Sequence, residues 1–104
     1  MLYRHGDVLV QHVDSQQWAQ VRAAAHPRPG AVLARGEVTG HSHRFRDPAQ
    51  VQLYTAGAET FVQVTAPSAD LIHEEHATIT LPQGTYRVWM QREYSPEAIR
   101  RVID

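Results

Sequence analysis

Short segments with the residue pattern of β-strands, separated at close intervals by turn-forming residues, limit this chain most strongly to one class of fold. β-branched and aromatic residues recur in each segment, and glycine, proline and aspartate fall between them. The segments cover residues 8–13, 31–35, 51–54, 60–65, 76–81 and 85–91. We expect two hairpins, one turning at residues 56–58 and one at residues 82–84. So many short strands in 104 residues predict a mainly β fold, a small barrel or sandwich.

One stretch departs from the strand pattern. Asp14 or Ser15 can cap a short helix in which Trp18 and Val21 share one face, and Pro27 ends the stretch. We therefore expect one short N-terminal helix.

The chain length and the lack of internal repeats predict a single domain over residues 1–104. Ten basic residues, all arginine, and eleven acidic residues leave a formal net charge of −1, which argues against binding nucleic acid or membrane by charge alone. The first residues lack the apolar core of a signal peptide, and no apolar run reaches the roughly 18–20 residues of a membrane span. We expect a cytoplasmic protein without membrane contact.

Histidine is unusually frequent in this chain, and its imidazole ring binds transition metals. The chain has seven histidines and no cysteine, which excludes disulfides, thiolate nucleophiles and thiolate metal sites. His41 and His43 are two residues apart, a spacing that places both rings on one face of a strand. Phe45 continues the same alternation, so we expect this face to point inward.

The second pair, His73 and His76, is separated by three residues. A helical or turn-like backbone would bring both rings together, whereas an extended strand would direct His73 and Glu75 inward and Glu74 and His76 outward. The sequence favours neither conformation. It does exclude the H-E-x-x-H pattern of zinc proteases, because alanine occupies the position of the second histidine.

We therefore predict a site for one divalent transition metal (zinc, iron, nickel, manganese or copper), held by histidines of the two pairs. The predicted metal ligands are His41, His43, His73 and His76. Glu74 or Glu75 would be a further ligand, a partner of the ligands, or a general base. His5, His12 and His26 are isolated in the sequence, and we expect no role for them.

A strand over residues 85–91 carries large side chains on both faces. Arg87 and Gln91 could point into the mouth of a barrel and contact an anionic or polar substrate, or they could belong to an ordinary solvated face. Arg92, Arg100 and Arg101 form the one basic group that could contact nucleic acid, although acidic residues lie among them.

Residues 36–91 resemble cupins, which are small jelly-roll β-barrels with two short motifs. The first cupin motif has a glycine, an H-x-H pair and then an acidic ligand. Gly36, His41, His43 and Asp47 are similar to it, although Asp47 with the following proline is also typical of a plain turn.

The second cupin motif, P-x-G followed by a metal-binding histidine, resembles residues 82–84, but Arg87 occupies the position of that histidine. A fourth ligand would then come from His73 or His76. The resemblance implies a jelly-roll barrel and a metal but no particular reaction, because cupins include dioxygenases, isomerases and non-enzymatic binding proteins.

Two functions are compatible with these patterns. An open coordination position facing a pocket would favour a metalloenzyme of unknown reaction acting on a small-molecule substrate. A closed four-ligand site would favour a non-catalytic binding or interaction module in which the ion is structural. Trp18 or Trp89 exposed at a sheet edge would favour a homodimer.

Overall fold

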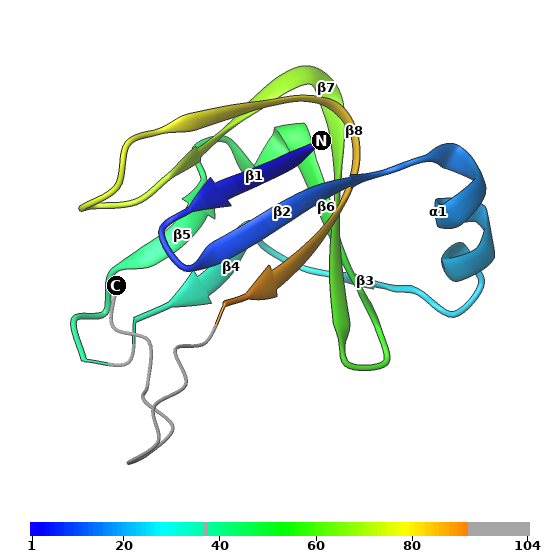
Figure 1. The fold of residues 1–104 in the computed structure, drawn as a ribbon, viewed down its shortest axis with the longest axis horizontal. Coiled ribbons are helices and arrows are strands. Elements are labelled where there is room, and N and C mark those ends of the chain that lie inside the picture. The colour runs from blue at the N-terminus through cyan, green and yellow to red at the C-terminus, as the bar shows by residue number, and fades with distance from the viewer. Residues whose placement is uncertain (37, 92–104) are drawn as a thin grey trace.

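The computed structural model describes residues 1–36 and 38–91 (Figure 1). These residues form a mainly β domain with eight antiparallel strands, one α-helix and one 3-10 turn. The elements are β1 (Leu2–His5), β2 (Val8–Val13), α1 (Ser15–Arg22), β3 (His26–Arg28), β4 (Val32–Arg35), β5 (Ser42–Phe45), η1 (Pro48–Gln50), β6 (Val51–Ala56), β7 (Glu59–Ile72) and β8 (Ile79–Met90).

The strands belong to one curved sheet. Its main path runs β1-β2-β8-β7-β5-β4, and β6 pairs with both β7 and β3. No pairing among the described residues joins β1 to β4, so the sheet is open. β7 pairs with β6 along its first half and with β5 at its end. It therefore joins the β3–β6 pair to the main path of the sheet.

The long hairpin of β7 and β8 bends in its middle (Figure 1). Val64 pairs with Gly84 and Ser68 pairs with Pro82, so β7 carries two extra residues at the bend. Residues 82–84 therefore lie inside β8, and the prediction of a hairpin turn at these residues is wrong. The proline and glycine bend a continuous strand, and the turn of this hairpin is the loop of residues 73–78.

The predicted helix and the first predicted hairpin are confirmed. The Asp14 carboxylate accepts the amide of Gln17, and the Gln17 side chain accepts the amide of Asp14, so Asp14 caps α1. β6 and β7 pair in register around a turn that contains Gly57 at φ +62°.

Two groups of apolar side chains form the core. The larger group lies inside the curve of the sheet: Val8, Val10, Ala31, Phe45, Val51, Leu53, Val62, Val64, Ala69, Leu71, Leu81, Tyr86 and Val88. The smaller group attaches α1, because the Trp18 ring packs 5.1 Å from Tyr54 and 5.4 Å from Phe61. Figure 1 shows that α1 lies at the end of the molecule opposite the tip of the β7–β8 hairpin.

β1 was not predicted, because we expected the first strand to begin at Val8. Leu2–His5 is only four residues long and carries two charged or polar side chains near its end. It pairs with β2 through a turn of two residues, Gly6 and Asp7, which places His5 opposite Val8.

The arginine group Arg92, Arg100 and Arg101 lies outside the described residues. Within the described part of the chain, no helix has the length and apolar character needed to cross a membrane.

Candidate metal centre

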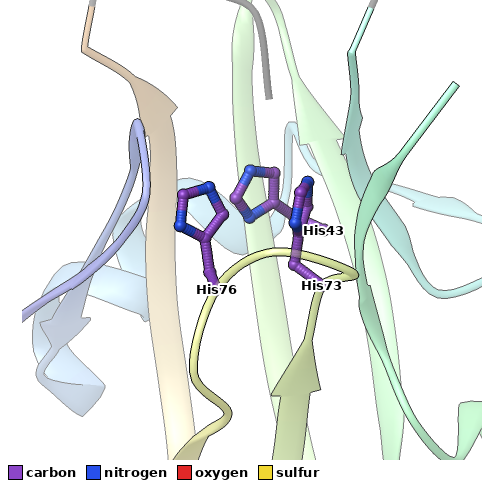
Figure 2. Close-up of side chains that lie close together, drawn as sticks. All are labelled: His43, His73 and His76. Atoms are coloured by element: carbon purple, nitrogen blue, oxygen red, sulfur yellow. The ribbon is translucent and has the colours of Figure 1, made fainter. Parts of the chain in front are cut away.

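Four imidazole rings meet between the β1–β2 turn, β5 and the β7–β8 loop. We call His5, His43, His73 and His76 the histidine cluster. The ring of His43 lies 4.4 Å from that of His73 and 5.4 Å from that of His76, and the last two lie 4.5 Å apart. The His5 ring lies 4.9 Å from His43. Figure 2 shows the rings of His43, His73 and His76 directed toward one another.

The loop of residues 73–78 brings the second histidine pair together. It bends directly after β7, so His73 and His76 point the same way, as a turn-like backbone predicts. The Glu75 amide donates a hydrogen bond of 2.9 Å to His73 Nδ1 inside this turn. The extended alternative, with the two rings on opposite faces, is not the one that the chain adopts.

The first pair divides between the core and the surface. His43 lies on β5 with its side chain fully buried, and Phe45 is buried two residues later, so the inward orientation is confirmed for His43 but not for His41. His41 precedes β5 and is 31% exposed. Its ring lies 5.7 Å from that of His73, and its Nδ1 lies 3.3 Å from a carboxylate oxygen of Glu75.

Gly6 covers the cluster. Its φ is +61°, and a Cβ atom there would lie 2.6 Å from His76 Nε2 and 3.0 Å from His43 Cε1. Only glycine therefore combines this turn conformation with such a close approach of the backbone to the rings.

The nitrogens fit a transition-metal ion. Ligand atoms of His43, His73 and His76 all lie within 4.8 Å of one another. A tetrahedral zinc ion bound at 2.0–2.1 Å needs ligand nitrogens about 3.3 Å apart, so small side-chain shifts would close the site. Of these three residues, His43 and His73 are buried and His76 is partly exposed.

His5 restricts how His43 can bind an ion. The two Nδ1 atoms lie 2.9 Å apart, so one ring donates and the other accepts. Burial, followed by the neighbouring His43, lowers the pKa of His5 to about 4. His5 is therefore neutral near pH 7, and its Nδ1 can accept a hydrogen bond from His43 Nδ1–H, which would leave the lone pair of His43 Nε2 available to bind an ion.

A second group of ligand atoms lies nearer the surface. Ligand atoms of His41, His73 and Glu74 also come within 4.8 Å of one another, and His73 belongs to both groups. The structure thus brings together all four predicted metal ligands, but in two overlapping sets and not around one point.

The two carboxylates predicted as general bases anchor the loop. Glu74 Oε1 accepts hydrogen bonds of 3.1 Å from the Ser42 amide and from Arg44 Nη1. Backbone amides, its own first and then that of Ser42, together with Arg44, lower the pKa of Glu74 to about 2. A carboxylate this weakly basic does not suit proton abstraction, and Glu75 is paired with His41.

The structure does not bring Arg87 to the cluster. Arg87 Nε lies 2.7 Å from a Glu59 carboxylate oxygen, and its guanidinium stacks 5.0 Å from the centre of the Trp89 ring. Arg87 alternates along β8 with the buried Tyr86 and Val88, so it lies on the outer face of the sheet. The exposed Gln91 follows β8, and its amide donates to the Asp7 carbonyl.

His5 is the site residue that sequence reasoning missed. The signal was the dipeptide Gly6-Asp7, because a two-residue hairpin turn pairs the residues on either side of it. Val8 has the inward orientation of a core residue, and its partner His5 must therefore share that face. His12 and His26 are exposed and lie outside the cluster.

Asp47, the acidic residue of the cupin-like motif, has a local role. Its carboxylate accepts the Ala49 amide at 3.0 Å and caps the η1 turn. It belongs to neither group of potential ligands.

Comparison with known proteins identifies one relationship. No curated protein and no solved structure matches the chain. One family model, described as a domain of unknown function, matches residues 4–91, a range that contains the whole histidine cluster. The chain therefore belongs to the domain-of-unknown-function family DUF8820.

Proposed function

We propose that this protein binds one divalent transition-metal ion through His43, His73 and His76, with His5 orienting His43. The observation that carries the proposal is the convergence of three imidazoles, two of them buried, from β5 and the β7–β8 loop, with ligand atoms within 4.8 Å of one another. His43 lies thirty residues before His73 in the sequence. The three rings meet only because the β7–β8 loop, which carries His73 and His76, is folded onto β5.

An ion accounts for this arrangement better than packing alone. One cation can accept a lone pair from each of three imidazoles at once, and the ligand atoms of His43, His73 and His76 lie close enough together for this.

The donor set indicates which ions would bind. Neutral imidazole suits zinc, copper, iron and nickel, whereas calcium and magnesium prefer oxygen donors. The inner group contains no carboxylate, and the chain has no cysteine to favour a thiolate-bound ion. We therefore propose zinc, copper, iron or nickel ahead of manganese.

The role that the surroundings favour is stabilisation of the domain. The ion would join β5 to the β7–β8 loop beneath the β1–β2 turn. Both carboxylates expected as general bases are engaged in holding the loop. A non-catalytic, metal-stabilised binding domain is thus the function that we put first.

A metalloenzyme is the second candidate, and one observation favours it. The inner group supplies three protein ligands, which would leave a coordination position for water or a small-molecule substrate. Binding of azide to the cobalt-loaded protein, followed by its visible spectrum, would distinguish the two roles: an open position changes the spectrum, and a closed site does not.

We also propose that the open sheet is a reduced form of a cupin-like barrel. An H-x-H pair leading into a buried strand and fully antiparallel pairing support this proposal. Its metal ligands would differ from those of cupins, because Asp47 and Arg87 are engaged elsewhere and the β7–β8 loop would replace them.

Isothermal titration of zinc into untagged, chelator-treated protein tests the proposal. We expect about one ion per chain, and we expect His43→Ala to weaken binding by at least about 100-fold. His26→Ala, a change at an exposed histidine of β3, is the matched control and should bind as the wild type does. Equal binding by His43→Ala, or substoichiometric binding by the wild type, would contradict the proposal.

A further inference from the structure

The residues around the histidine cluster change steadily from exposed to buried. The side chains of Glu75, Glu74 and His41 are 57%, 39% and 31% exposed, whereas His73 and His43 are 8% and 0% exposed. His41 lies between the exposed and the buried residues, since its Nδ1 lies 3.3 Å from Glu75 and its ring lies 5.7 Å from that of His73.

From this series we infer that His41, Glu74 and His73 form an outer cation site through which a divalent transition-metal ion reaches the histidine cluster. The inference rests on the proposed function, because it describes how the same inner site is filled. Ligand atoms of the three residues lie within 4.8 Å of one another, the same limit that the inner group meets.

His73 is the residue that makes transfer between the two sites feasible. It belongs to the outer group with His41 and Glu74 and to the inner group with His43 and His76. His73 is thus the residue common to both groups, and an ion that moves inward would exchange His41 and Glu74 for His43 and His76 while His73 stays within reach.

The outer carboxylate is held in place before any ion arrives. Glu74 Oε1 accepts the Ser42 amide and Arg44 Nη1, both at 3.1 Å, and these contacts fix the position of the carboxylate beside His41 and His73. Arg44 offsets part of the negative charge of Glu74, and Glu75, paired with His41, supplies a second carboxylate on the exposed side.

The outer and inner sites are expected to differ in affinity, and this difference favours transfer of the ion inward. Carboxylates at the surface attract cations and raise the rate of encounter. Three imidazoles bind zinc, copper or nickel more tightly than a mixed set with one carboxylate oxygen. The outer site therefore favours capture, and the inner site favours retention.

Stopped-flow loading of the full chain with Co²⁺, followed by its visible absorption, tests the relay. We expect His41→Ala and Glu74→Gln to lower the association rate at least about tenfold while the equilibrium affinity stays within a factor of about three. Glu74→Gln keeps an oxygen that can accept from Ser42 and Arg44, so the loop should stay folded. His12→Ala is the matched control and should load at the wild-type rate.

Each other result has a distinct meaning. Wild-type loading rates in both variants would overturn the relay and leave the proposed function intact. A loss of affinity as large as that of His43→Ala would also overturn it, because the outer residues would then be ligands of the tight site. A wild-type protein that binds no Co²⁺ would contradict the proposed function itself.

Discussion

The Nδ1 atoms of His5 and His43 lie 2.9 Å apart, so the two rings share a single proton between them. β1 and β5, which carry these residues, are not neighbours in the sheet, and the contact therefore depends on the curvature of the whole domain. If His43 binds an ion through Nε2, its Nδ1 must carry that proton, and His5 is the acceptor that holds the ring in this tautomer.

Replacement of His5 should weaken metal binding without removing a ligand. We expect His5→Leu to lower zinc affinity about 10- to 100-fold, because the acceptor for His43 Nδ1–H is lost. His5→Asn should retain most of the affinity, since its amide oxygen can stand where Nδ1 does. Competition with a chelator of known affinity measures both variants, and equal binding by wild type and His5→Leu would show that His5 does not orient His43.

Substitution of Gly6 should destabilise the domain more than substitution of another turn glycine. Gly6 and Gly57 have the same conformation, with φ of +61° and +62°, but only at Gly6 would a Cβ meet the histidine rings. We expect Gly57→Ala to cost about 1 kcal/mol from backbone strain and Gly6→Ala about 1–3 kcal/mol more from overpacking. Urea unfolding measures the difference, and equal costs would mean that the turn does not press on the cluster.

The stability of the metal-free protein should fall as the pH falls from about 6.5 to 4. Burial lowers the folded-state pKa of His5 from 6.5 to about 4, so its contribution to stability is complete above pH 6.5. It is lost between pH 6.5 and 4, where the unfolded chain binds a proton that the folded ring does not. We expect roughly 2–3 kcal/mol over this range. His5→Asn cannot titrate and should reduce the slope, and an unchanged slope of unfolding free energy against pH would contradict this account.

Metal binding should break the hydrogen bond inside the β7–β8 loop. The Glu75 amide donates to His73 Nδ1, so a neutral His73 carries its proton on Nε2. An ion on either nitrogen is incompatible with this arrangement, because the proton must leave or move to Nδ1. We expect zinc to shift the Glu75 amide proton upfield in the NMR spectrum, and an unperturbed Glu75 amide in the zinc-saturated protein would exclude His73 as a ligand.

The sequence predicts those features of the fold that have local causes. The cap at Asp14 predicts the start of the helix, and the turn glycine at Gly57 predicts a hairpin, because both effects act within a few residues. The prediction failed at Pro82 and Gly84, because these residues bend a strand that pairs with β7 on both sides of the bend and with β2 from Thr85 onward. That outcome depends on tertiary pairing, which local pattern does not contain.

The same distinction applies to the candidate site. Alternation with Phe45 was enough to predict that His43 points inward. The sequence does not decide the arrangement of His73 and His76, because residues three apart lie on opposite faces of a strand but on the same side of a turn. Only the packing of the loop on β5 decides between the two. His5 was missed because its strand carries too little apolar pattern to be recognised alone.

X-ray absorption at the metal edge of the zinc-loaded protein tests the central claim most directly. The account predicts at least three imidazole nitrogens at about 2.0–2.1 Å and no sulfur. His43→Ala should lose one of these nitrogens or bind no zinc. A shell of oxygen ligands alone, or a spectrum unchanged by His43→Ala, would contradict the assignment of the histidine cluster as a metal site.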